Sequence, residues 1–175
     1  MQKLLTLAFF TLLCHTRLQA THIVGGEITY KCLGNDQYEL TLSVYRDCYN
    51  GQPYFDQPAI IGIYRADWTL YKKDTVLIDF VSGTLPIVLT NPCLTDPPDV
   101  CVHMAMYRKV VTLPFSPGGY TLVYQRCCRN MLIRNLPDPL NTGISYTATI
   151  TEESMLACNN AAVFNDWPPV CSAGQ

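Results

Sequence analysis

The chain has 175 residues, of which 49% are hydrophobic and 15% are charged, and its formal net charge is −2. This composition is typical of one folded domain with a buried core, and it excludes a disordered or fibrous chain. The 12 basic and 14 acidic residues create no broad positive field, so we do not expect nucleic acid as a partner.

The amino-terminal segment has the order of a secretory signal peptide. A positive start at Met1-Gln2-Lys3 precedes an apolar run from Leu4 to Cys14, and a polar stretch follows that ends in the small residue Ala20. The apolar run is shorter than the roughly 20 residues that span a bilayer. We therefore expect residues 1–20 to be removed and a mature domain over 21–175 without a transmembrane segment. Lipidation at Cys14 is the alternative.

Period-two alternation dominates the mature chain. In chain order, the expected strands are Glu27 to Lys31, Tyr38 to Tyr45, Ala59 to Arg65, Thr75 to Val81, Val102 to Val111, Tyr120 to Tyr124 and Ile144 to Thr151. Turn residues such as Ser116-Pro117-Gly118-Gly119 separate these runs. The pattern predicts an all-β fold, a disulfide-braced antiparallel β-sandwich that is immunoglobulin-like in broad architecture.

Eight cysteines remain once the leader, with Cys14, is removed. An even number in an exported chain predicts a disulfide framework. Its members are Cys32, Cys48, Cys93, Cys101, Cys127, Cys128, Cys158 and Cys171.

Two bridges are predicted from loop length. Cys93 and Cys101 bracket a short turn-forming loop, which favours a bridge between them. A bridge between Cys158 and Cys171 would tether a carboxy-terminal tail, about residues 156–175, for which we expect no regular structure.

The other four cysteines are paired by elimination. Cys127 and Cys128 would take Cys32 and Cys48, because adjacent residues on a strand point to opposite faces and reach separate partners. A ring between the neighbours Cys127 and Cys128 is the alternative.

The sequence carries no recognisable catalytic or metal-binding motif. Ile23-Val24-Gly25-Gly26 resembles the new amino terminus of an activated trypsin-like protease, but the segments that would supply the base and the nucleophile are missing, and we interpret it as the lead-in to the first strand. The mature chain holds only His22 and His103 as histidines, and no cysteine or histidine spacing suits zinc. Asp96 and Asp99 fit a solvated loop better than a calcium site. We therefore expect no catalysis, no cofactor and no metal.

The most specific string is Tyr124-Gln125-Arg126-Cys127-Cys128-Arg129-Asn130. Arg126, Arg129 and Arg134 could together bind an anionic group such as a sugar acid. The alternative, which we favour, is that these arginines satisfy strand-end carbonyls or a carboxylate such as Asp47.

Aromatic residues admit two interpretations. The 11 tyrosines, with Trp68 and Trp167, could form a stacking platform for sugars. The core interpretation is favoured for the tyrosines that fall in register with aliphatic residues, namely Tyr38, Tyr120, Tyr124 and Tyr146.

Several strings carry a family resemblance. They are Ala20 to Tyr30, Val44 to Cys48, Pro117 to Tyr120 and Tyr124 to Asn130. Together they resemble the amino-terminal region of large secreted surface proteins of Bacteroidetes, of the gliding-motility-associated or PKD-domain-containing type. The resemblance implies an adhesin-type role at the outer cell surface, with export by the type IX route, and it carries over no catalytic residue. Such relatives continue through repeats to a sorting domain that this sequence does not contain, so the periplasm and free secretion are alternative locations.

These observations predict an exported, non-catalytic cell-surface module for structure or adhesion, which binds glycan or another surface protein. The alternative is an extracellular glycan-active hydrolase or its accessory domain, which would need two convergent carboxylates, with Asp47, Asp56 and Asp79 as candidates. A third hypothesis is a structural cap that begins a long surface filament.

Overall fold

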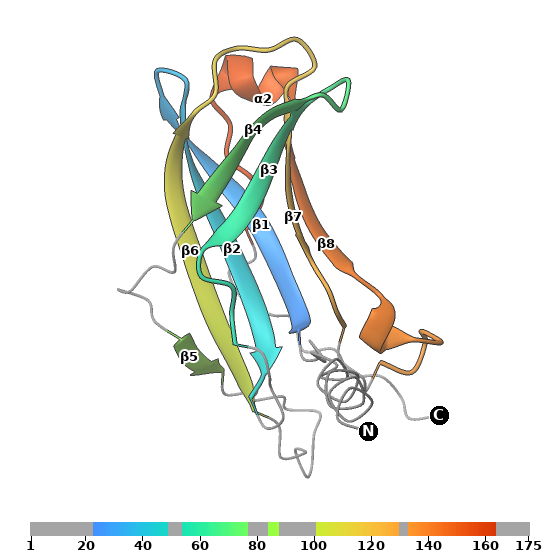
Figure 1. The fold of residues 1–175 in the computed structure, drawn as a ribbon. Helices are drawn as coiled ribbons and strands as arrows, with labels where there is room; N and C mark the ends of the chain where they lie inside the picture. Colours follow the sequence, from blue (N-terminus) through green and yellow to red (C-terminus); the bar gives the residue numbers. More distant parts are fainter. Residues whose placement is uncertain (1–22, 49–53, 77–83, 88–100, 130–132, 164–175) are drawn as a thin grey trace, which may run out of the picture.

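The computed structural model describes residues 23–48, 54–76, 84–87, 101–129 and 133–163, with the backbone alone at 84–87. Two four-stranded sheets pack face to face (Figure 1). The strands are β1 (Ile23–Gly34), β2 (Gln37–Asp47), β3 (Ala59–Arg65), β4 (Leu70–Val76), β5 (Thr84–Ile87), β6 (Val102–Thr112), β7 (Tyr120–Arg126) and β8 (Ile144–Ile150). The first sheet has the order β1-β2-β6-β5 and the second β4-β3-β7-β8. All of their pairings are antiparallel, so the all-β sandwich prediction is confirmed.

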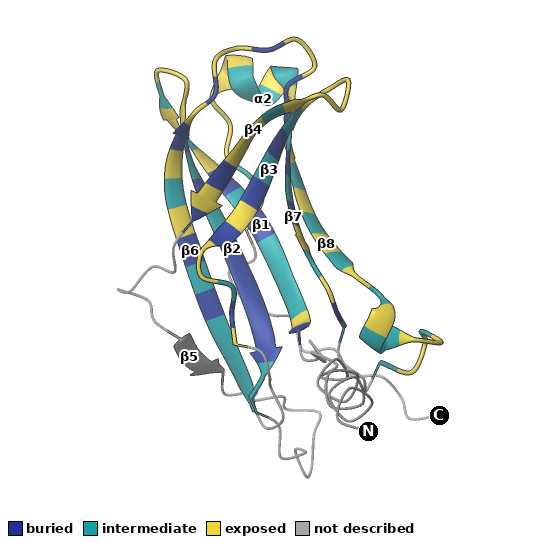
Figure 2. Ribbon diagram, in the orientation of Figure 1, coloured by how far each residue is buried: buried dark blue, intermediate teal, exposed yellow. Residues whose placement is uncertain are grey.

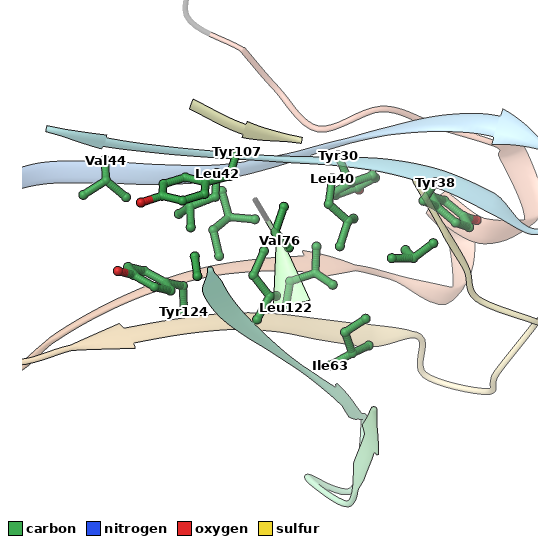
Figure 3. Packing of buried hydrophobic residues seen from close by; sticks show 14 of the residues in the cluster. Tyr30, Tyr38, Leu40, Leu42, Val44, Ile63, Val76, Tyr107, Leu122 and Tyr124 are labelled. Atoms are coloured by element: carbon green, nitrogen blue, oxygen red, sulfur yellow. The ribbon is translucent and has the colours of Figure 1, made fainter. Parts of the chain in front are cut away.

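The core lies between the sheets, where alternate side chains of facing strands meet. On β2 the predicted inward set, Tyr38, Leu40, Leu42 and Val44, is buried. These residues face a buried row on β7 that includes Leu122 and Tyr124 (Figure 3). Each such side chain contributes about 1.5 to 3 kcal/mol when it leaves water. The core interpretation of the tyrosines is thus confirmed for Tyr38, Tyr120 and Tyr124, and Tyr146 is half-buried beside them.

Strands β1, β4 and β5 differ most from the sequence prediction. Strand β1 begins at Ile23, so Ile23-Val24-Gly25-Gly26 belongs to the strand instead of leading into it. The strand expected over Thr75 to Val81 is β4, which runs instead from Leu70 to Val76, and residues 77–81 lie outside the described part. Period-two alternation does not locate β4, because Asp74, a charged residue, points into the sandwich. The short strand β5 was missed because Pro86 interrupts its pattern.

The predicted turn before β7 is confirmed, and it requires glycine. The Gly119 N–H donates to the Ser116 carbonyl at 2.8 Å, which closes the turn. Gly119 has φ +78°, and a Cβ there would lie 2.0 Å from the carbonyl oxygen of Ile150. No other residue fits this position without moving the backbone of β8.

The disulfide prediction for Cys93 and Cys101 is wrong, because Cys101 is bonded to Cys48. The two residues flank paired strand ends: Asp47 on β2 stands opposite Val102 on β6, and the Cys48 N–H donates to the Cys101 carbonyl at 3.0 Å. Loop length favoured a local bridge, whereas strand pairing makes a long-range one. Cys93 itself lies outside the described residues.

The prediction for Cys158 and Cys171 is also wrong, because Cys158 is bonded to Cys32 on β1, with the two Cα atoms 5.3 Å apart. Cys127 and Cys128 do not reach Cys32 and Cys48 but are bonded to each other, which was the alternative. That pairing was deduced from the Cys93–Cys101 and Cys158–Cys171 bridges, and neither of these forms. Cys171 lies outside the described residues.

The expected tail begins in the last residues of a short helix, and its residues 158–163 have no regular structure, as predicted. Helix α2 (Glu152–Ala157) follows β8 and is capped by Thr151, whose hydroxyl accepts from the Ser154 N–H at 3.1 Å. Beyond the helix, the chain turns back along the free edge of β1. There the Ala161 N–H donates to the Tyr30 carbonyl at 2.8 Å, and the Asn160 side chain accepts from the Cys32 N–H at 2.9 Å.

Candidate functional site

Arg126, at the end of β7, points into the sandwich rather than toward solvent. Its side chain is only 8% exposed. Its Nη2 donates to the Tyr54 carbonyl at 2.7 Å and lies 3.4 Å from a carboxylate oxygen of Asp56. The guanidinium therefore ties the segment before β3 to the end of β7.

Asp56, in the segment before β3, contacts two buried tyrosines as well as Arg126. Its carboxylate accepts a hydrogen bond from the Tyr124 hydroxyl at 2.6 Å, and its carbonyl accepts one from the Tyr107 hydroxyl at 2.8 Å. Burial, reinforced by Asp56, raises the pKa of both hydroxyls, so they remain protonated donors. Burial also raises the pKa of Tyr146 to about 12, against the opposing charges of Arg129 and Arg126.

Arg129 and Arg134 occupy different surroundings. The Arg129 Nε donates to the Gly143 carbonyl at 3.1 Å, and its backbone N–H donates to the carbonyls of Pro139 and Thr142 at 3.1 Å each. Arg134 is exposed. The contacts of Arg126 and Arg129 with backbone carbonyls are of the kind that the structural alternative anticipated, with Asp56 rather than Asp47 as the carboxylate of Arg126. An anion site shared by all three arginines stays a prediction.

The candidate hydrolase carboxylates are not brought into one cleft among the described residues. Asp56 is held by Tyr124 and Arg126, Asp47 ends β2, and Asp79 lies outside the described part. Among the described residues, the most deeply buried carboxylate is one that the sequence did not single out. Asp74 on β4 is 5% exposed and bonds to Lys109, which reaches across from β6.

Among the described residues, atoms that could bind a metal ion also gather around one disulfide. Cys48, Cys101 and His103 each bring one such atom within 4.8 Å of the others. The two sulfurs are joined in a disulfide, so they do not offer the thiolates that a zinc site requires. Asp96 and Asp99, the calcium alternative, lie outside the described residues.

The most exposed aromatic residue of the described part is Trp68, which lies in the turn between β3 and β4. Its side chain is 67% exposed. Its ring centroid is 6.2 Å from that of Tyr64 on β3, with the planes tilted by 53°. Gly62 makes room for the tyrosine, since a Cβ there would lie 2.7 Å from Tyr64 Cε2. We refer to Tyr64 and Trp68 as the aromatic pair.

The turn that carries Trp68 is closed by hydrogen bonds. The Trp68 N–H donates to the Arg65 carbonyl at 2.9 Å, and the Arg65 N–H donates to the Thr69 carbonyl at 2.9 Å. The Asp67 carboxylate accepts from the Thr69 N–H at 2.9 Å and from its hydroxyl at 2.6 Å. These bonds to Thr69 lower the pKa of Asp67, which therefore remains ionised.

The conformation and exposure of Trp68 are energetically unfavourable. Its φ of +63° is in the left-handed region, which a bulky side chain rarely adopts, and its indole remains in water. A strained backbone held in place by surrounding hydrogen bonds is a common feature of functional sites. Trp68 and Trp167 are equivalent candidates in the sequence. The turn geometry decides the exposure of Trp68, and Trp167 lies outside the described residues.

Comparisons with protein-family models, curated proteins and solved structures found no match. Within the part of the chain that the structure describes, no helix combines the length and apolar character needed to cross a membrane. The disulfides fit an oxidising compartment outside the cytoplasm.

A groove of about 450 Å³ lies on the outer face of the first sheet, beside the returning tail. Side chains of Thr29, Thr41, Ser43 and Met106 line it together with charges of both signs from Glu27, Lys31, Glu39 and Arg108. Mixed charges of this kind are typical of a solvated sheet face, and the groove lacks an exposed aromatic ring. The β3–β4 turn is the better candidate site.

Proposed function

We propose that this chain is an exported, non-catalytic surface module that binds glycan through the aromatic pair. The single observation that carries the proposal is Trp68, an exposed indole held in a left-handed backbone conformation in a hydrogen-bonded turn. An aromatic ring of this kind offers the flat apolar surface on which the C–H face of a sugar ring stacks.

The polar neighbours of Trp68 support glycan as the ligand. Asp67 is ionised, and both of its hydrogen bonds to Thr69 use Oδ1. A sugar hydroxyl can therefore donate to Oδ2 while the ring stacks on the indole. A carboxylate on the residue next to the indole suits a neutral, hydroxyl-rich ligand better than an anionic one, because Asp67 would repel an acid.

The hydrolase alternative lacks comparable support. Among the described residues, Asp56 is bonded to Tyr124 and Asp74 is bonded to Lys109. These two carboxylates thus already have structural roles. Glu27 and Glu39 line one groove on the first sheet, but they do so beside the opposite charges of Lys31 and Arg108.

We also infer an immunoglobulin-like architecture, for which the topology gives support. The sheets β1-β2-β6-β5 and β4-β3-β7-β8 correspond to the strand orders ABED and C′CFG. Tyr120 opens β7, the equivalent of strand F, and its hydroxyl donates to the Pro114 carbonyl six residues upstream at 3.0 Å, as in a tyrosine corner. Together with the resemblance to Bacteroidetes surface proteins, this favours an adhesin-type module exported by the type IX route.

A glycan array followed by calorimetric titration of the best neutral glycan tests the proposal. We expect Trp68→Ala to weaken binding about tenfold or more, because the stacking surface is lost. The matched control is Phe115→Ala, which removes another exposed aromatic ring, 49% exposed, outside the turn. A titration in which both variants bind like the wild type, or an array without any bound neutral glycan, would contradict the proposal.

A further inference from the structure

The four outer strands of the sandwich differ in how their free edges are treated. These strands are β1 and β5 in the first sheet and β4 and β8 in the second. A free edge exposes unpaired N–H and C=O groups, which are open to pairing with another strand, and proteins usually block such edges.

Three of these edges carry a blocking device. On β1, the chain after α2 hydrogen-bonds to Tyr30 through Ala161. Arg129 forms an isolated parallel β-bridge with Ile23. Strand β5 has four residues and contains Pro86. Strand β4 has a register irregularity in its pairing with β3 and an inward charge at Asp74, both of which discourage a further strand.

Strand β8 packs against β1 across the sandwich. Among the described residues, its free edge carries none of these devices. Its seven residues, Ile-Ser-Tyr-Thr-Ala-Thr-Ile, include no charge and no proline. It pairs with β7 without interruption from Ile144 to Ile150. Its outward residues Ser145, Thr147 and Thr149 are exposed, and Figure 2 shows exposed and half-buried positions alternating along the strand.

The sequence of β8 is also complementary to itself. In an antiparallel pair centred on Thr147, Ser145 faces Thr149 and Tyr146 faces Ala148. Hydroxyl then meets hydroxyl and a large side chain meets a small one, and both are favourable cross-strand pairs. Because β8 carries no charge, a second copy meets no repulsion along the strand.

We propose that the free edge of β8 pairs with β8 of a second copy of this chain, about a twofold axis at Thr147. The contact is isologous and therefore closes as a dimer. The second sheets of the two copies then form one continuous sheet. In this dimer the β3–β4 turns of the two copies lie at the two outer edges of the continuous sheet, because β4 and β3 are at the other edge of the second sheet from β8. This inference does not depend on glycan binding.

Sedimentation equilibrium of the oxidised mature chain, from about 1 µM to about 1 mM, tests the dimer, because one strand pair makes a small and weak interface. We expect Thr147→Lys to weaken association about fivefold or more, because two like charges then face each other across the axis. Thr75→Lys is the control, since Thr75 is an exposed residue of the blocked edge strand β4.

Two further measurements separate pairing from a loss of folding. An equimolar mixture of Thr147→Lys and Thr147→Glu should restore association, because opposite charges then meet at the axis. Thr147→Cys should form a covalent dimer on oxidation, whereas Thr75→Cys should not, since directly opposite residues of an antiparallel pair lie close enough for a disulfide. A wild-type chain that remains monomeric throughout, or a dimer indifferent to residue 147, overturns the proposal, and pairing of β8 only with a different protein overturns it as well.

Discussion

The buried carboxylate of Asp74 joins the two sheets. It lies on β4 and bonds to Lys109 on β6, while Lys72 lies 3.0 Å from its other oxygen. Burial by itself would raise the pKa of Asp74, but the hydrogen bonds and charges of Lys109 and Lys72 outweigh it and hold the pKa below the ordinary value. The ion pair therefore stabilises the sandwich only while Asp74 is ionised.

We expect Asp74→Asn to reduce the free energy of unfolding by about 1 to 2 kcal/mol at pH 7. A carboxylate with a lowered pKa stabilises the fold above its unfolded pKa of about 4, and this contribution disappears as the pH falls through the lower folded value. Urea unfolding of both proteins between pH 7 and pH 3 should show a constant difference above about pH 5 that shrinks toward pH 3. A difference that is unchanged at pH 3 would show that the ion pair is not its source.

Gly119 and Gly34 provide a matched pair of positions with similar backbone angles. Both have positive φ, +78° and +83°, but a Cβ at Gly34 would meet nothing within 4 Å, whereas one at Gly119 would collide with β8. We expect Gly34→Ala to cost about 1 kcal/mol of stability and Gly119→Ala about 3 kcal/mol or more. Equal losses in chemical denaturation would refute the role of the close approach between the turn and Ile150.

For single residues, the sequence predicted which side chains point inward better than it predicted which residues they contact. The alternation on β2 correctly identified Tyr38, Leu40, Leu42 and Val44 as inward. The same pattern could not reveal that Asp74 points inward, because its partner Lys109 is on a distant strand. Nor could it distinguish Asp56 from Asp47 as the carboxylate near Arg126, since that choice depends on how the segment before β3 folds back.

The elements show a similar division between local and long-range information. Strand β3 has the predicted bounds, and the turn before β7 follows directly from its Pro-Gly-Gly residues. The exposure of Trp68 could not be predicted, because it results from a turn closed by Asp67 and Thr69 rather than from periodicity. Helix α2 has six residues, too few for a helical period to stand out.

The bridge between β1 and the end of α2 should be the strongest covalent brace of the described part. It links residues 126 positions apart, whereas Cys127 and Cys128 are adjacent. In the chain-entropy model, a loop of that length contributes about 4 to 5 kcal/mol, and a bridge between neighbours contributes far less. Cys32→Ser with Cys158→Ser should therefore lower the melting temperature much more than Cys127→Ser with Cys128→Ser. Calorimetry that finds equal effects would contradict this ranking.

At the scale of the whole molecule, the sandwich follows from period-two alternation and frequent turns, which the sequence displays openly. The disulfide connectivity does not, because Cys48 and Cys101 become neighbours only after β2 and β6 pair. The candidate site likewise depends on strand pairing. Tyr64 and Trp68 are ordinary aromatic residues in the sequence. The hairpin of β3 and β4, whose turn lies at one end of the fold (Figure 1), brings their rings together.

Fluorescence of Trp68 tests the central claim, glycan binding at the β3–β4 turn, most directly. The chain has two tryptophans, so Trp167→Phe leaves Trp68 as the sole indole emitter. On addition of the best neutral glycan from the array, we expect the emission to shift to shorter wavelength and iodide quenching to decrease, because the exposed indole becomes covered. Saturable glycan binding that leaves both the emission and the quenching of Trp68 unchanged would contradict the account.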